Sequence, residues 1–230
     1  MSVIFSGNTY QPGDDGRLYK AGTYVREDDS VMKPGGKIFY IDETGGEGAT
    51  YTFYDSHGVE IPESAIAVGD EPYAYKITGT PNKPKYYVFY PNAVTSKTWT
   101  YQAEGSWVYN LLGTTDGIGA GKTNTDIVMA ADDGAYVAWT NSIWHALKDM
   151  RDNSYGGQSD WHVGSKAELE ALRLAVDCDG NPLTNLFATT YIWSSSENSA
   201  GYAWCWGYPG QCWDSLSKNL NLALLAVRAF

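Results

Sequence analysis

The segment GIGAGKT at 117–123 comes nearest to a motif with a known chemistry, the phosphate-binding loop. A loop of the GxxxxGK[ST] type cradles phosphates with backbone amides, and its first glycine would have to stand at position 116. Asp116 stands there instead, and its carboxylate would repel a phosphate group. No hydrophobic strand leads into the loop. The sequence therefore predicts a flexible glycine loop followed by a short buried segment at 126–131, and no nucleotide site.

Metal ligands are sparse. His57, His145 and His162 are scattered, and none lies in an HExxH motif or at another close ligand spacing, so a zinc site would have to be assembled from distant positions. Residues 177–181 alternate acidic and amide side chains as a calcium loop does, but the glycine is misplaced and no bidentate glutamate follows. We expect structural or surface histidines and no cofactor, and the sequence leaves calcium binding open.

The cysteines offer the only candidate for covalent chemistry. Cys205 and Cys212 lie seven residues apart in an aromatic tail, and Cys178 makes their number odd. The pair is compatible with reactive thiols, a copper site, a disulfide, or two small half-buried residues. No general base lies near either cysteine in the sequence, and no nucleophile elbow or carboxylate dyad is recognisable. The residues thus argue against an enzyme.

The composition favours binding. Of 230 residues, 43% are hydrophobic and 19% are charged, which excludes a disordered tail, a coiled coil and a collagen-like rod. There are 18 Tyr and 9 Trp but only 6 Phe, and Tyr and Trp are favoured on surfaces that are half wet. Together with abundant Gly, Ser and Asn, this pattern is closer to a paratope than to an enzyme interior.

The charge balance excludes two classes of partner. The chain carries 16 basic and 27 acidic residues, a net charge of −11. Because no Lys/Arg cluster is present to hold phosphates, we expect neither nucleic acid nor an anionic membrane surface as a partner. The first residues lack the basic start of a signal peptide, and no apolar run approaches the roughly 18 residues of a transmembrane helix. We expect no membrane insertion.

The elements that must position these residues are readable in part. Short segments rich in aromatic and β-branched residues predict strands, with turns between them at 55–58 and 81–84. The predicted strands are 37–42, 49–55, 73–78, 85–90 and 97–102.

Two main helices are predicted in the middle of the chain, at about 134–152 and 165–177, where apolar residues recur at helical spacing. Ser165 and Glu168 form a capping box at the start of the second helix. Its polar face, expected to point to water, consists of Lys166, Glu170 and Arg173. A β-rich segment, then helices, then a β-rich segment is typical of the α+β class.

Blocks in the second half of the chain occur in a recognisable order. They are GKTNTDIVMAA (121–131), SIWHALKDMRDN (142–153), SDWHVGSKAELEAL (159–172), YIWSSSENSAGYAWCW (191–206) and a terminal VRAF (227–230). Over about residues 115–230 the chain resembles the variable proteins of diversity-generating retroelements. GGKIFYID at 35–42 is similar to the opening strand of their ligand-binding domain.

The resemblance implies a C-type-lectin-type fold, of the subtype that formylglycine-generating enzymes share, with mixed and antiparallel sheets. The domain would cover residues 35–230, with a diversified region at about 191–230. Residues 1–34 would form an N-terminal extension.

In that family a reverse transcriptase copies a template with errors at adenines. Asn codons of the AAY type then change to codons for small, polar, Tyr, Leu or Cys residues, but not to those for Trp, Lys, Gln or Glu. The resemblance implies that Trp204, Trp206, Gln211 and Lys218 are constant. The candidate ligand-binding residues around them are Tyr202, Cys205, Gly207, Tyr208, Pro209, Cys212, Trp213, Asp214, Ser215, Leu216, Ser217, Asn219, Leu220, Asn221 and Leu222.

Two features depart from this pattern. Trp213 cannot arise from an AAY codon, so either the template encodes it or the variable positions are displaced. Residues 220–230 are more apolar than an exposed variable strand, and their period-two leucines fit a buried final strand equally well.

The resemblance implies a non-enzymatic binding protein whose partner is a protein or glycan receptor on a target cell. It would be a receptor-binding protein of a phage or virus, or a prokaryotic surface adhesin, and the lack of a readable signal peptide favours the phage particle over the cell surface. Two alternatives stay open. One is an oxidase of the formylglycine-generating type that uses Cys205 and Cys212, and the other is a lectin-like domain of fixed specificity for carbohydrate or collagen.

Overall fold

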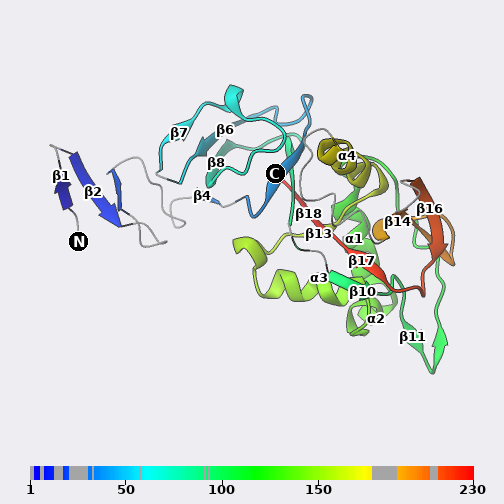
Figure 1. Ribbon diagram of the computed structural model, residues 1–230. Coiled ribbons are helices and arrows are strands. Elements are labelled where there is room, and N and C mark those ends of the chain that lie inside the picture. The colour runs from blue at the N-terminus through cyan, green and yellow to red at the C-terminus, as the bar shows by residue number, and fades with distance from the viewer. Residues whose placement is uncertain are drawn as a thin grey trace.

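The computed structural model (Figure 1) describes the strand backbone at 3–5, 8–12, 18–20 and 31–32, and residues 34–56, 58–90, 92, 94–177, 191–207 and 212–230. The residues discussed above that lie outside this description are His57, Cys178, Asp179, Asn181, Tyr208, Pro209 and Gln211.

The chain is an α+β protein with several sheets, as the sequence predicts. All described strand pairs are antiparallel except β14 with β17. Two small sheets have the spatial order β1 (Val3–Phe5), β2 (Asn8–Pro12), β3 (Leu18–Lys20) and β11 (Gln102–Ala103), β12 (Ser106–Trp107). Two four-stranded sheets have the orders β4 (Val31–Met32), β8 (Ala74–Gly79), β6 (Ala49–Tyr54), β7 (Glu60–Ile61) and β13 (His162–Val163), β18 (Ala226–Ala229), β9 (Tyr86–Phe89), β5 (Lys37–Ile41). The five-stranded sheet has the order β10 (Val94–Lys97), β17 (Leu222–Leu224), β14 (Ile192–Glu197), β15 (Tyr202–Gly207), β16 (Cys212–Ser217).

The helices are α1 (Ala120–Ala130), α2 (Ala135–Ala138), α3 (Ile143–Asp152) and α4 (Lys166–Asp177). Helix α4 and its capping box are confirmed: the Ser165 amide donates to Glu168 Oε2 at 2.9 Å, and the Glu168 amide donates to Ser165 Oγ at 3.2 Å. Four of the predicted strands, at 37–42, 49–55, 73–78 and 85–90, correspond to β5, β6, β8 and β9.

The single helix predicted over 134–152 is wrong, because the segment folds as α2 and α3. Helix α2 ends where Trp139 turns to an extended conformation. A new helix then begins at Ser142, whose hydroxyl accepts the His145 amide at 2.9 Å. The Ser142 hydroxyl gives a partner to one of the amides at the start of α3 that have none within the helix. A new helix can therefore begin here in a different direction.

The strand predicted at 97–102 is also wrong beyond Lys97. Trp99 lies fully buried in the core and meets the Trp144 ring edge-on, with centroids 5.0 Å apart. Its indole N–H donates to the Ser194 carbonyl at 2.9 Å. The amides of Trp99 and Thr100 both donate to the Lys218 carbonyl, which is not the pattern of a regular ladder.

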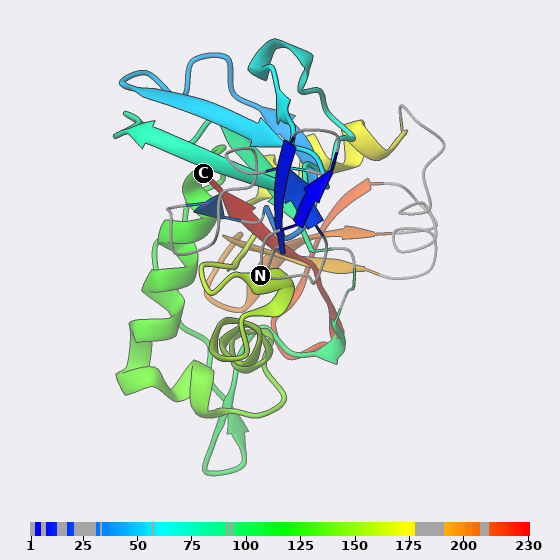
Figure 2. The ribbon, with the colours of Figure 1, turned by 90° about the vertical axis from the view of Figure 1, so that its left-hand side faces the viewer.

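Two groups of buried side chains lie on the two faces of the five-stranded sheet. Trp193 and Cys205 face the larger one, with Trp144 of α3, and Ile192 and Trp206 face the other, with Leu172 of α4. In Figures 1 and 2 the sheet accordingly lies between α4 and the α2–α3 region.

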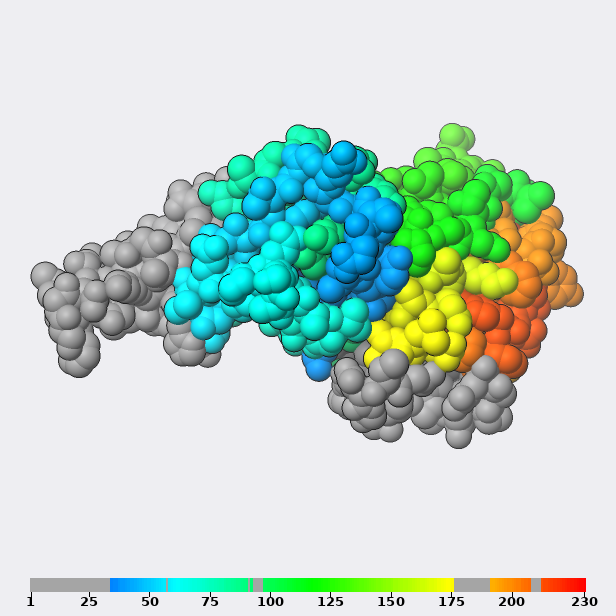
Figure 3. Space-filling model, turned by 90° about the horizontal axis from the view of Figure 1, so that it is seen from above, coloured from blue at the N-terminus to red at the C-terminus, as the bar shows by residue number. Residues whose placement is uncertain are grey.

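The end of the chain is part of the core. Residues 223–228 are all buried, and β18 lies between β9 and β13. Arg228 donates to the Tyr75 hydroxyl at 2.6 Å and pairs with Asp160, while the Phe230 ring stacks on Tyr75 with centroids 3.8 Å apart. The terminal VRAF therefore joins the sheet of residues 31–79 to the rest of the domain. Figure 3 shows residues 34–80 at one end of this domain and the orange residues near 200 at the other.

Candidate ligand-binding surface

Most of the candidate residues that the structure describes lie on one hairpin. Strands β15 and β16 pair antiparallel, with Tyr202 opposite Ser217 and Gly207 opposite Cys212. Strand β16 is the edge of the five-stranded sheet. Because side chains alternate along a strand, the hairpin has two faces, and the candidate residues are divided between them.

The face toward α4 carries three indoles. The Lys166 ammonium lies 3.4 Å from the centroid of the Trp204 ring and 5.6 Å from that of Trp213. The Arg173 guanidinium lies 4.9 Å from the Trp206 centroid. Such cation–π contacts fix the rings at the surface, each contributing about 0.5–1 kcal/mol at exposed sites.

Glu170 completes this cluster. Its Oε2 accepts the Trp213 indole N–H at 2.8 Å, and its Oε1 accepts from Arg173 Nη2 at 2.6 Å. The Arg173 guanidinium, together with the Trp213 N–H, holds the pKa of the Glu170 carboxyl below its usual value. The polar face of α4, predicted to point only to water, therefore positions the tryptophans of the hairpin. In the sequence, Lys166, Glu170 and Arg173 stand at positions i, i+4 and i+7 of one helix, and the tail is rich in Trp. This pattern could have indicated the contact.

The opposite face of the hairpin joins the core. The Cys205 side chain is fully buried, and Leu216 packs against the same group of side chains. Burial raises the pKa of the Cys205 thiol to about 12. Cys212 is exposed, and both thiols are free. Opposite Cys212, Gly207 is covered by the ring of Tyr191, which lies 1.9 Å from where a β-carbon on Gly207 would stand.

The turn after β16 separates surface from core. Leu220 is 43% exposed, and Asn221 is exposed and accepts the Asn141 side-chain amide at 3.1 Å. Leu222 is half-buried, and residues 223–228 are buried. The question that the sequence left open about 220–230 is thus answered by a boundary at residues 221–222, with surface before it and core after it.

A buried ion pair supports the hairpin. Lys218 Nζ lies 2.6 Å from Glu197 Oε1, donates to the Asn110 carbonyl at 2.9 Å, and lies 4.3 Å from the Trp99 ring centroid. The main-chain carbonyl of Lys218 accepts the amides of Trp99 and Thr100. Lys218 thus anchors the end of β16 to the core through both its side chain and its main chain.

The carboxylate of Glu197 has a second set of partners, which the sequence did not reveal. Its Oε2 accepts the amides of Leu112, Gly113 and Thr114 at 2.9, 3.0 and 3.3 Å. These donors lie more than eighty residues earlier in the chain, so no local pattern could have indicated them.

The glycine loop at 117–123 is the N-terminus of α1, where the sequence predicted a flexible loop. The amides of Gly119 and Gly121 donate to Glu168 Oε1 at 3.0 and 3.4 Å. Glu168 is fully buried and also lies 3.3 Å from His162 Nε2. An internal carboxylate therefore occupies the position where a helix N-terminus would hold a phosphate.

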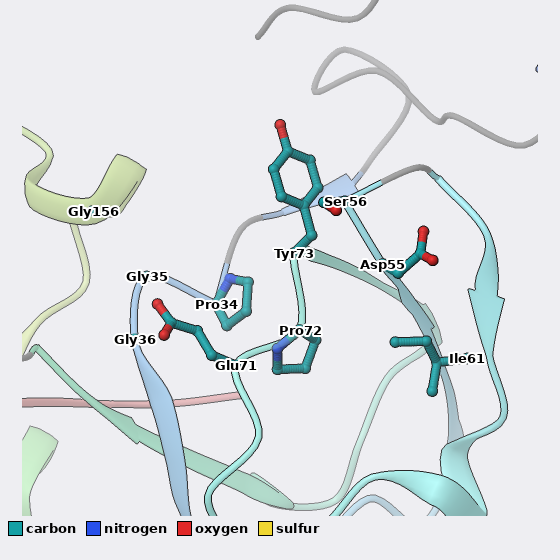
Figure 4. A pocket seen from close by; sticks show the side chains of 10 residues that line it. All are labelled: Pro34, Gly35, Gly36, Asp55, Ser56, Ile61, Glu71, Pro72, Tyr73 and Gly156. Carbon is teal, nitrogen blue, oxygen red and sulfur yellow. The ribbon is translucent and has the colours of Figure 1, made fainter. Parts of the chain in front are cut away.

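The two larger hollows in the described part of the chain lie away from the hairpin. One, of about 500 Å³, is lined by Asp55, Glu71 and Tyr73 beside two prolines, and Figure 4 shows its two carboxylates well apart. The other, of about 660 Å³, is a mainly apolar groove near Met129 and Val137. Neither is lined by a candidate ligand-binding residue from the sequence.

Within the described ranges, no three His, Cys, Asp or Glu side chains gather closely enough to hold a metal ion. In the same ranges, no helix has the length and apolar character needed to cross a membrane. No protein-family model matches the chain, and no curated protein sequence matches it.

Proposed function

We propose that the chain is a non-enzymatic ligand-binding protein with a C-type-lectin-type fold, whose site is the β15–β16 hairpin and the turn that follows it. By resemblance, this site is diversified by a retroelement and serves receptor binding by a phage or virus, or adhesion by a prokaryotic cell.

The observation that carries the proposal is the burial pattern of the hairpin. Of the residues expected to be constant, Trp206 and Lys218 are buried. The candidate ligand-binding residues of β16 are half-exposed or exposed along a sheet edge. A frame that is buried beneath an accessible edge tolerates side-chain exchange at that edge.

The resemblance blocks also form one packed unit, which supports the fold proposed. Helix α1 contacts β14, α4 contacts β14 and β15, and α3 contacts β10 of the same sheet. The opening strand β5 and the last strand β18 both pair with β9, so the two ends of residues 35–230 meet in one sheet.

The oxidase alternative needs two reactive thiols. A thiol whose pKa is raised to about 12 is almost entirely protonated at neutral pH, and the thiolate is the reactive form. The buried position of Cys205 therefore favours binding over this alternative, although a copper titration of the protein tests it directly.

Deep sequencing of the 3′ end of the gene and its downstream DNA, from a population of the source genome, tests the proposal. We expect variation confined to codons for residues 202–222 and a downstream near-copy that differs only at adenines. An invariant 3′ end without such a copy would contradict diversification and favour the fixed-specificity lectin.

A further inference from the structure

The accessible face of the β15–β16 hairpin combines aromatic rings with hydroxyls. The register pairs Tyr202 with Ser217 and Trp204 with Ser215, so these four side chains point to one side of the sheet. Trp213, two residues before Ser215, points to the same side. Tyr202 is 49% exposed, and the other four are half-exposed. A partner that meets this face therefore meets all five side chains together.

Lys166, at the start of α4, lies over this face. Helix α4 packs on β14 and β15 (Figure 1), and the Lys166 amide donates to Ser196 Oγ of β14 at 3.0 Å. The ammonium reaches the rings, 3.4 Å from the Trp204 centroid and 5.6 Å from that of Trp213. The residue is half-buried. Both ends of this side chain are therefore positioned by the fold.

The ammonium of Lys166 lacks an anionic partner. Among the residues that the structure describes, none forms an ion pair or a hydrogen bond with it. The carboxylate of this cluster, Glu170, is engaged by Arg173 and by the Trp213 indole N–H. The cluster thus holds two cations and one carboxylate, which is an excess of one positive charge on a chain whose net charge is −11.

A carboxylate from outside the chain would complete this arrangement. An ammonium has three N–H donors, and an indole face attracts its charge without accepting a conventional hydrogen bond. A carboxylate would add charge-assisted hydrogen bonds, which are roughly twice as strong as neutral ones. The rings beside Lys166 would exclude water from the pair, and the attraction between opposite charges grows as the surroundings become less polar.

We infer that Lys166, held on Trp204, binds an Asp or Glu side chain of a protein partner, while Tyr202 contacts apolar atoms beside it. The rings, the hydroxyls and the Asn198 amide, which donates to Ser215 Oγ at 2.8 Å, together have the composition of a protein-binding paratope. An acidic glycan fits less well, because the ammonium lies over a face of the Trp204 ring on which a sugar would stack.

This inference deepens the proposed function, because it names the ligand class, and it rests on the proposed function for the hairpin as the binding site. Lys166 and Trp204 are not among the candidate residues for variation. They would therefore offer the same carboxylate site in every variant of the hairpin, while the side chains at 202, 215 and 217 would select among acidic partners.

The test uses a phage-displayed library of random peptides selected against the full chain. We expect the enriched peptides to share an Asp or Glu, and synthetic copies with Asn or Gln in its place to bind about tenfold or more weakly. Lys166→Gln should bind the acidic and the amide copies alike, whereas Lys166→Arg, which keeps the cation, should still distinguish them. Lys148→Gln is the matched control and should behave as the wild type does, because Lys148 is an exposed lysine of α3, across the sheet from α4.

The hairpin variant Tyr202→Ser separates this inference from the proposed function. Loss of binding in Tyr202→Ser but not in Lys166→Gln overturns the inference and leaves the proposed function standing. Enriched peptides that depend on neither residue contradict both. The same proteins are also tested on carboxylated oligosaccharides and their neutral counterparts. Binding of the carboxylated sugars that requires Lys166, with no acidic peptide enriched, overturns the choice of a protein partner.

Discussion

Glu197 and Lys218 form a buried ion pair, with Oε1 and Nζ 2.6 Å apart and both side chains at most 1% exposed. Glu197 is the last residue of β14 and Lys218 is the first residue after β16, so the pair links these two strand ends. Because Glu197 also holds the amides of residues 112–114, the hairpin and residues 112–114 share one anchor.

Removing one partner should therefore destabilise the protein strongly. We expect Glu197→Gln or Lys218→Met to lower the free energy of unfolding by about 3–5 kcal/mol, since each leaves a buried charge uncompensated. Denaturant unfolding measures this change. The exposed pair Lys122–Asp126 supplies the control, because Asp126→Asn should cost less than about 1 kcal/mol. Equal effects of the two kinds of substitution would show that the buried pair is not an anchor.

The N-terminus of α1 provides a steric test of the Glu168 site. A β-carbon on Gly121 would stand 2.2 Å from Glu168 Oε2, whereas one on Gly117 would meet nothing within 4 Å. We expect Gly121→Ala to cost about 1–3 kcal/mol in unfolding free energy, as overpacking does. Gly117→Ala should stay within about 0.5 kcal/mol of the wild type. If both variants unfold at the wild-type denaturant midpoint, the glutamate does not fill the helix terminus.

Whether the sequence predicts an element of this structure depends on how far apart in the chain the contacting residues lie. The capping box at Ser165 and the aromatic strands rest on neighbouring residues; the capping box and four of the five predicted strands are correct. Helix α1 was missed because its N-terminal amides are satisfied by Glu168, more than forty residues away. The helix break at 139–142 is signalled locally only by the short polar run Thr140, Asn141 and Ser142.

The candidate site shows the same limit. The candidate residues were chosen by which amino acids an AAY codon can become, and this criterion does not distinguish the two faces of a strand. It therefore placed buried Cys205 and half-exposed Ser215 in the same set. Pairing between β15 and β16 decides which of these side chains a partner can reach. Lys166 and Glu170 entered the site only through packing of α4 on the hairpin.

The Glu170 contacts predict a pH response of the hairpin. The pKa of Glu170 is lowered in the folded state, so its stabilising contribution is present above the unfolded value of about 4.5 and is lost as pH falls through the lower folded pKa. Protonation should weaken the acceptor for the Trp213 indole N–H. We expect tryptophan fluorescence to change in this acidic range before global unfolding, and Glu170→Gln to abolish that change. A fluorescence titration that is identical in the two proteins would contradict the assignment.

Thiol labelling distinguishes the two cysteines of the hairpin. In a Cys178→Ser background, a neutral-pH thiol reagent should modify exposed Cys212 quickly and reach Cys205 only after denaturation, because burial raises the pKa of Cys205 to about 12. Mass spectrometry of the labelled protein locates the modified residue. Rapid labelling of native Cys205 would restore the oxidase alternative.

Substitution to Asn, the residue that the template would encode, tests which candidate positions are free to vary. Ser215 is half-exposed on the edge strand, so Ser215→Asn should change the unfolding free energy by less than about 0.5 kcal/mol. Cys205 is fully buried in the core, where Cys205→Asn would bury an amide with few partners and cost about 1–3 kcal/mol. Thermal and denaturant unfolding of the two variants measure the contrast. If it holds and the site is diversified as proposed, sequenced populations should show small apolar residues or Cys at position 205 and broad variation at 215, because selection for a folded hairpin would remove the variants that do not fold. Equal tolerance at the two positions would mean that the hairpin faces are reversed, with Cys205 toward the partner.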